Sequence, residues 1–164
     1  MSIEIREANL ADSAEAEQFL TVLESYAMDE MGGGAALHPE VRQRLVPALL
    51  EQTNALVLLA LSDARVVGIA TCFFGFSTFA ARSLLNVHDL AVLPEFRGQG
   101  VGRALLAGAE ARARARGSAK LTLEVREDNA RARRLYEAEG FRDFELAGAS
   151  FRTLFLAKPL APKP

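Results

Sequence analysis

Three alternating glycines give this chain a segment that could bind an anion. The segment is Arg97-Gly98-Gln99-Gly100-Val101-Gly102, and it lies between a predicted strand and a predicted helix. The first N–H groups of a helix have no partner within it and lie at its partly positive end, so they suit a phosphate or pyrophosphate. Glycine lets a ligand approach this backbone without meeting a Cβ. We therefore predict a phosphate-binding turn.

Two common phosphate loops do not match the segment. A dinucleotide fingerprint needs a third glycine where Arg103 stands, and a nucleoside-triphosphate loop needs Lys-Ser/Thr in place of Arg103-Ala104. A flexible turn before an ordinary helix would also be glycine-rich. A second block further along the chain argues against that alternative, because Asn129 is followed after six residues by Tyr136 and then by Gly140-Phe141.

In this order the two blocks resemble the GCN5-related N-acetyltransferases, whose first block is Arg/Gln-x-x-Gly-x-Gly/Ala. Members of that superfamily move an acyl group from a coenzyme A thioester to an amine. The resemblance implies an α/β (α+β) fold with a mixed central sheet of roughly six to seven strands, one splayed strand pair and about four helices. It also implies acetyl-CoA as co-substrate and no metal.

The resemblance places the cofactor between two strands, Leu84 to Leu93 and Lys120 to Val125, which start side by side and then splay apart. The pantetheine arm would lie along the first strand, and the pyrophosphate would lie on the amides of the glycine segment, as helix electrostatics also predicts. The expected cofactor-binding residues are Leu90, Val92, Arg97, Gly98, Gln99, Gly100, Val101, Gly102, Arg103, Asn129 and Tyr136.

Tyr136 is the general acid that the resemblance implies, protonating the departing thiolate. A phenol is protonated at neutral pH and can donate to sulfur. Seven helical residues return the side chain to within about 20° and advance it by ~10 Å, so Asn129 and Tyr136 are expected to share one face. A core tyrosine on an amphipathic helix is the structural alternative.

A general base is also needed, because an amine attacks only when it is neutral. The resemblance places this base at His88, whose neutral imidazole can accept a proton near pH 7. A hydrogen-bonded core histidine is the alternative, and Glu124, Glu127 or water could serve instead. Where the two strands splay apart, no neighbouring strand is expected to accept a hydrogen bond from the backbone N–H of Val92. This N–H is therefore expected to stabilise the thioester oxyanion.

Strand alternation predicts two faces for the segment that carries His88. Asn86, His88, Leu90 and Val92 would share one face, and Val87, Asp89 and Ala91 the other. Asp89 would then turn toward the packing helices and anchor a backbone turn or another side chain.

Direct attack of the amine on acetyl-CoA in a ternary complex needs no acyl-enzyme, and Cys72 is expected to be a buried apolar residue. Acceptor contacts are expected around Tyr26 to His38 and Phe73 to Phe79, where Asp29 and Glu30 beside a mobile glycine loop would suit a small cationic or amino-acid-like amine. The alternatives are a non-catalytic acyl-CoA sensor or interaction module and a protein N-terminal or lysine acetyltransferase.

Hydrophobic periodicity and turn residues predict the elements that must hold these residues. The expected helices are about Asp12 to Met28, with Asp12 as its cap, Pro39 to Gln52, Val101 to Arg116 and Asn129 to Glu139, which Gly140 stops. The expected strands are Ile3 to Glu7, Ala55 to Leu61, Val66 to Phe76, Leu84 to Leu93, Lys120 to Val125, Arg142 to Leu146 and Phe151 to Ala157.

Size and composition indicate one domain over residues 1–164, because half of the 164 residues are hydrophobic. The proline-rich segment from Lys158 to Pro164 is expected to be a loose tail. A formal net charge of −2 gives no broad basic field for nucleic acid. No apolar run approaches the ~18 residues of a membrane span. The N-terminal sequence does not have the pattern of a secretion signal, and a lone cysteine cannot form an internal disulfide, so a cytoplasmic protein is expected. The expected assembly is a homodimer.

Overall fold

The computed structural model describes residues 2–146, 149–151, 155–158 and 160. Two compact units are present, Met1–Leu123 and Glu124–Pro164. The glycine segment and His88 belong to the first unit, and Asn129 and Tyr136 belong to the second.

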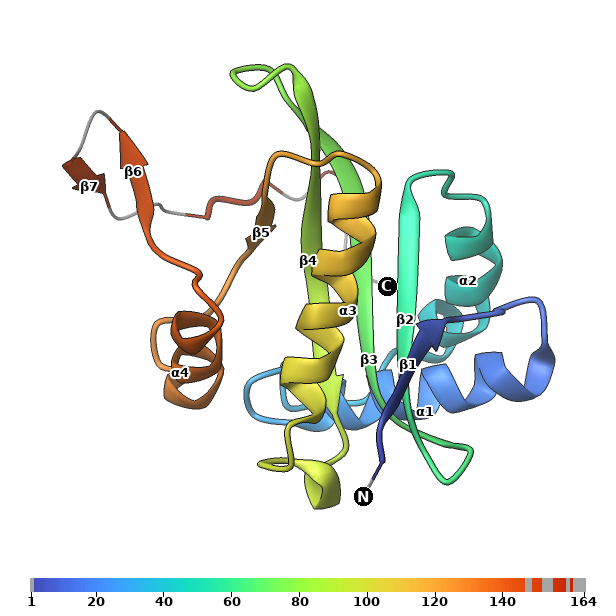
Figure 1. Ribbon diagram of the computed structural model, residues 1–164. Helices are drawn as coiled ribbons and strands as arrows, with labels where there is room; N and C mark the ends of the chain where they lie inside the picture. The colour runs from blue at the N-terminus through green and yellow to red at the C-terminus, as the bar shows by residue number, and fades with distance from the viewer. Residues whose placement is uncertain (1, 147–148, 152–154, 159, 161–164) are drawn as a thin grey trace. The chain divides into compact units, whose positions relative to one another are not determined.

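The first unit contains a five-stranded sheet in the order β1-β2-β3-β4-β5 (Figure 1). The strands are β1 (Glu4–Glu7), β2 (Ala55–Ser62), β3 (Arg65–Ser77), β4 (Arg82–Val92) and β5 (Leu121–Leu123). Neighbours from β1 to β4 are antiparallel, and β5 runs parallel to β4.

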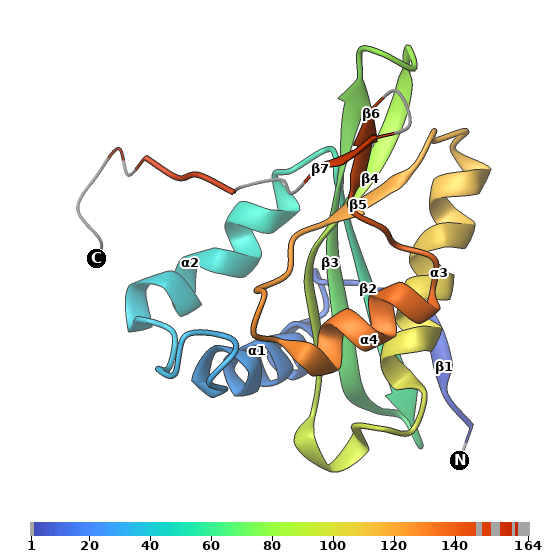
Figure 2. The same ribbon diagram turned by 90° about the vertical axis from the view of Figure 1, so that its left-hand side faces the viewer.

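Helices cover both faces of this sheet (Figure 2). One face carries α1 (Ser13–Met28) and α2 (Pro39–Leu50), and the other carries α3 (Val101–Ala115). The predicted cap of the first helix is confirmed, because the Asp12 side chain accepts a hydrogen bond from Glu15 N at 2.9 Å. An acceptor there satisfies one of the amides that the first helical turn leaves without a partner.

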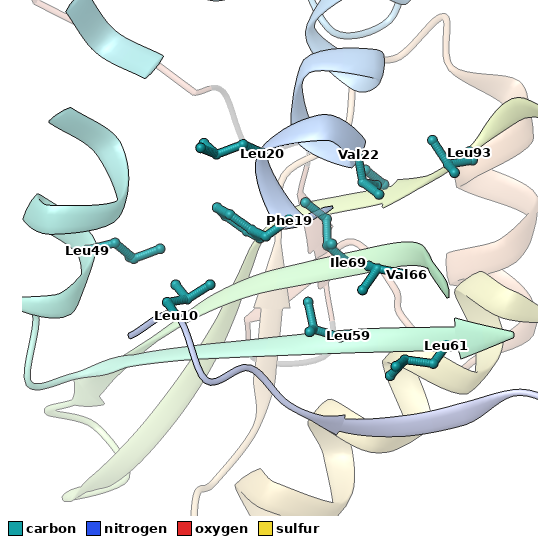
Figure 3. Close-up of a cluster of buried hydrophobic side chains, with 11 residues drawn as sticks. Leu10, Phe19, Leu20, Val22, Leu49, Leu59, Leu61, Val66, Ile69 and Leu93 are labelled. Atoms are coloured by element: carbon teal, nitrogen blue, oxygen red, sulfur yellow. The ribbon is translucent and has the colours of Figure 1, made fainter. Parts of the chain in front are cut away.

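Apolar side chains fill the space between the sheet and α1 (Figure 3). Removing their apolar surface from water is the main favourable contribution to folding. The cluster consists of Leu10, Phe19, Leu20, Val22, Leu49, Leu59, Leu61, Val66, Ile69, Ala91 and Leu93. On the other face α3 lies very close to the sheet, because a Cβ at Gly108 would stand 2.7 Å from Ile5 Cγ2.

The second unit contains α4 (Ala130–Ala138) and a two-stranded antiparallel sheet of β6 (Phe144–Leu146) and β7 (Ala149–Phe151). The α/β class and the four helices are as expected, but the central sheet has five strands rather than roughly six to seven. The difference arises because β6 and β7 pair with each other and, among the described residues, with no other strand.

Among the described residues, the last predicted strand, Phe151 to Ala157, agrees with the structure only at Phe151. The structure ends β7 at Phe151, and Phe155 to Ala157 have no regular structure. Residues 152–154 lie outside the described residues, as does most of the predicted loose tail from Lys158 to Pro164.

Candidate active site

One edge of β4 is only partly covered by β5. The parallel pairing runs from Leu85 opposite Leu121 to Val87 opposite Leu123, where β5 ends. β4 itself continues to Val92. Among the described residues no strand pairs with that edge of β4 beyond Val87.

The backbone groups of Leu90 and Val92 face this uncovered edge. Leu93 N donates to Val67 O at 2.9 Å, so the peptide groups of Leu93 face β3. Because successive strand residues direct their N–H and C=O groups to opposite edges, those of Val92 and Leu90 face away from β3. The Val92 carbonyl accepts a hydrogen bond from Arg97 Nε at 3.0 Å on that side.

A β-bulge interrupts β4 at His88. Asp89 lies opposite Thr71, and Val87 lies opposite Cys72, so β4 carries one more residue than β3 between these pairs. A bulge of this kind reverses the alternation of side chains beyond it. The two faces predicted for residues 86–92 are therefore wrong.

The bulge brings Asn86, His88 and Asp89 to the same face. Asn86 lies opposite Phe73, and Asp89 lies opposite Thr71. Phe73 and Thr71 are two residues apart on β3, so they and their partners share a face. The His88 ring packs edge-on against Phe73, with ring centroids 5.6 Å apart. Phe73 also packs against the cluster beneath α1, which identifies this face as the α1 side.

Leu90 and Val92 point to the opposite face of the sheet from His88. Val92 lies opposite Gly68, where a Cβ would stand 3.0 Å from Val101 Cγ1 of α3. His88 and Val92 were expected on one face, and the extra residue in β4 is the physical reason that they are not.

Asp89 is a half-buried carboxyl beside the exposed His88. Burial raises the pKa of Asp89, and the His88 imidazole and the Thr71 hydroxyl lower it by less. The hydroxyl is not aligned as a donor, since Thr71 Oγ1 is a buried oxygen without a hydrogen-bond partner among the described residues. The site thus contains a poorly solvated carboxyl whose pKa lies above its ordinary value.

Cys72, the next residue after Thr71 on β3, is fully buried. Burial, with a smaller contribution from Asp89, raises the pKa of the Cys72 thiol to about 12. The thiol is therefore protonated near neutral pH, and since the thiolate is the nucleophilic form, a covalent role is disfavoured. The prediction of a buried apolar cysteine is confirmed.

The glycine segment forms an open turn at the start of α3, after a short 3-10 helix η1 (Pro94–Phe96). Gly98 and Gly100 have φ values of 73° and 84°, and a Cβ at either position would meet no atom within 4 Å. The first hydrogen bond of α3 joins Ala104 N to Gly100 O. The amides of residues 101–103 therefore precede the helical ladder, and the turn fits the phosphate group predicted for it.

The polar side chains of the glycine segment contact protein groups. Arg97 Nη2 lies 2.9 Å from Asp29 Oδ2, in addition to the bond from Arg97 Nε to the Val92 carbonyl. Gln99 Nε2 donates to Glu95 O at 2.8 Å. The side chains of Arg97 and Gln99 thus support the turn.

The predicted acceptor segment is a packed turn at the end of α1. Asp29 N donates to Tyr26 O at 3.0 Å, and Met31 N donates to Asp29 Oδ1 at 2.9 Å. A Cβ at Gly32 would lie only 1.8 Å from Tyr26 O, so this position requires glycine. The Asp29 carboxylate is paired with Arg97, which corrects the expectation that it would attract a cationic amine.

In the second unit, Asn129 and Tyr136 lie at the two ends of α4. The Asn129 side chain caps the helix by accepting a hydrogen bond from Ala132 N at 3.1 Å. The Tyr136 ring packs edge-on against Phe141 at 5.8 Å between centroids, and Phe141 N donates to Tyr136 O at 2.9 Å. Gly140, with a φ of 88°, allows the chain to turn back after α4 so that Phe141 reaches Tyr136. The second block therefore has a local structural function.

The described residues contain no group of three or more His, Cys, Asp or Glu side chains that could hold a metal ion. In the same residues, every helix is too short or too polar to cross a membrane.

Comparison with known proteins identifies the family. The acetyltransferase (GNAT) family model matches residues 19–141. The uncharacterized N-acetyltransferase YhfO of Bacillus subtilis is 31% identical over 142 residues, covering 85% of this chain and 89% of YhfO. The aminoalkylphosphonate N-acetyltransferase of Salmonella typhimurium is 35% identical over 95 residues, covering 58% of this chain and 62% of that one.

The crystal structure of a probable acetyltransferase has the same fold, with a TM-score of 0.77 at 22% identity over 97% of this chain and 100% of that one. The chain therefore belongs to the acetyltransferase (GNAT) family, and it is an N-acetyltransferase.

Proposed function

We propose that this enzyme transfers an acetyl group from acetyl-CoA to the primary amine of a small acceptor, by direct attack in a ternary complex. Acetyl-CoA is the acetyl donor that the family implies. The observation that carries the proposal is the uncovered edge of β4, where the backbone groups of Leu90 and Val92 lead toward the open turn at Gly98 and Gly100.

The pantetheine arm would bond to this edge as an added strand does. Leu90 and Val92 offer backbone groups that β3 does not use. The pyrophosphate would accept hydrogen bonds from the amides between Gly98 and Arg103, at the positive end of α3. When bound, acetyl-CoA supplies the activated thioester carbonyl.

His88 is the proposed general base. It is exposed at the bulge, and its imidazole packs against the Phe73 ring in a T-shaped arrangement. A neutral imidazole there would take the proton from the acceptor amine. Glu124, Glu127 and water remain the alternatives for this role.

The Val92 N–H is the proposed donor to the thioester oxygen as negative charge develops on it. One preorganised donor of this kind contributes about 3 kcal/mol to transition-state stabilisation. Because the Arg97 side chain holds the Val92 carbonyl, the adjoining backbone is supported from one side.

Tyr136 is the proposed acid that protonates the leaving thiolate, and Asn129 is proposed to contact the coenzyme arm. Both roles come from the family's second block. Since the two blocks belong to different units, we further propose that residues 1–164 act as one acetyltransferase domain. A cytoplasmic location and a homodimer stay predictions.

The small acceptor is supported by the Salmonella typhimurium relative, whose name gives an aminoalkylphosphonate as its substrate. The test is release of the coenzyme A thiol from acetyl-CoA with aminoalkylphosphonates, polyamines, amino acids, aminoglycosides and short peptides. Turnover on a small amine supports the proposal. Turnover on peptides alone would indicate a protein acetyltransferase, and tight binding of acetyl-CoA without turnover would indicate a sensor.

A further inference from the structure

The Arg97 side chain connects the glycine segment, which carries it, to two other parts of the first unit. Its Nε donates to the Val92 carbonyl at the end of β4 at 3.0 Å, and its Nη2 lies 2.9 Å from Asp29 Oδ2 at the end of α1. The side chains of Arg97 and Asp29 are 23% and 19% exposed. This ion pair is therefore more shielded from water than the surface pairs whose contribution is close to zero.

Asp29 also organises the turn that follows α1. Its Oδ1 accepts from Met31 N at 2.9 Å, and its backbone carbonyl accepts from Gly32 N at 2.8 Å. The same carbonyl accepts from the amides of Gly33 and Gly34, both at 3.1 Å. Asp29 thus holds the turn of the candidate acceptor segment. Through its second carboxylate oxygen, Asp29 also holds Arg97 beside the glycine turn.

This arrangement assigns Arg97 a different task from that of a phosphate ligand. Its positive charge is matched by the Asp29 carboxylate, and its Nε is used by the Val92 carbonyl. A guanidinium held at two points fixes the direction of the groups that it joins. The peptide groups of Val92 and the entry to the glycine turn are the groups held here.

We propose that Asp29 is a positioning residue for acetyl transfer, which acts through Arg97 on the Val92 backbone and on the glycine turn. The proposal rests on the proposed function, in which that backbone binds acetyl-CoA and its oxyanion. It implies that loss of the Asp29 charge impairs cofactor binding and the chemical step together, with the effect transmitted through Arg97.

The test is Asp29→Asn, which keeps the side-chain shape and the Oδ1 acceptor for Met31 but removes the charge that pairs with Arg97. We expect a Kd for coenzyme A, measured by calorimetry, about tenfold higher than in the wild type, as for the loss of one charged hydrogen bond. We expect kcat to fall as well, because the Val92 N–H is less well oriented. A merely structural change would lower the unfolding temperature without raising this Kd.

A double-mutant cycle with Arg97→Gln tests the route through the arginine. If Asp29 acts through Arg97, the double variant Asp29→Asn/Arg97→Gln binds coenzyme A no more weakly than the worse single variant. Glu24→Gln is the matched control, because Glu24 also lies on α1 and pairs with Arg42 at 3.1 Å, at 26% and 32% exposure. Its Kd should stay within about twofold of the wild type.

Three results would overturn the proposal. Unchanged binding of coenzyme A by Asp29→Asn would show that the ion pair does not position the cofactor site, and tighter binding would show that Arg97 is a phosphate ligand restrained by Asp29. Additive effects in the cycle would show that the two residues act separately. If Asp29→Asn does not fold, Arg97→Gln alone decides, and wild-type affinity in that variant contradicts the proposal. Failure of the wild type to bind coenzyme A would instead overturn the proposed function.

Discussion

At the scale of single residues, Asp89 links the site to stability. Burial raises the pKa of this carboxyl, so the folded protein holds its proton more tightly than the unfolded chain does. The stability contributed by this proton is complete below the unfolded pKa and is lost as pH rises through the folded pKa. Ionisation of Asp89 therefore lowers the free energy of unfolding.

Replacing Asp89 with Asn should stabilise the enzyme at pH 7, because the amide carries no charge to desolvate. We expect a rise in Tm of roughly 2–4 °C, which corresponds to a gain of about 1 kcal/mol in the free energy of unfolding for a chain of this size. Thermal unfolding followed from pH 7 to pH 4 provides the check. The gain should shrink as the wild-type carboxyl becomes protonated, and a gain that persists at pH 4 would point to a cause other than charge.

His88 should contribute most to catalysis at pH values at which the acceptor amine is protonated. His88→Gln is expected to lower kcat/KM at pH 7 by about 10²-fold, the usual contribution of a general base. The defect should diminish toward pH 10, where alkyl amines lose their proton without help. Initial rates across this range test the role, with Glu124→Gln and Glu127→Gln as controls. A large loss of activity in either control, with full activity in His88→Gln, would identify Glu124 or Glu127 as the general base.

At the scale of elements, the start of α3 depends on Gly68 of β3. A Cβ there would lie 3.0 Å from Val101 Cγ1 and 3.1 Å from the Ala91 carbonyl oxygen. Gly68→Ala should therefore push the glycine turn away from β4, weakening coenzyme A binding and costing about 1–3 kcal/mol of stability.

Gly75→Ala is the matched control for this substitution, since Gly75 lies on the same strand and a Cβ there meets only the flexible Leu84 side chain, at 3.3 Å. Calorimetric titration with coenzyme A and thermal unfolding distinguish the two variants. Equal effects at both positions would mean that the close approach of α3 is unimportant for binding.

Local sequence was sufficient to predict elements whose causes are local. The Asp12 cap, the turn before Val101 and the end of α4 before Gly140 all depend on residues within one or two turns of chain. The bulge at His88 was not predictable in this way, because it is set by the pairing register with β3. The contact between Asp29 and Arg97 depends on how α1 packs on the sheet, which no local pattern encodes.

At the scale of the whole molecule, the two family blocks divide the proposed chemistry between the units. The edge of β4 and the glycine turn belong to Met1–Leu123, and Tyr136 belongs to Glu124–Pro164. If the first unit supplies most of the cofactor contacts and Tyr136 supplies a proton to sulfur, binding and turnover should respond separately to substitution.

Tyr136→Phe tests this division, because it removes only the hydroxyl and leaves the ring that packs on Phe141. We expect kcat to fall by about 10²-fold, the usual effect of losing a general acid. The Kd for coenzyme A should change by less than about threefold, since loss of one neutral hydrogen bond costs little. Steady-state rates and calorimetry on the same preparation give both values. A parallel loss of affinity and rate would make Tyr136 a binding residue, and unchanged rates would leave protonation of the thiolate to water.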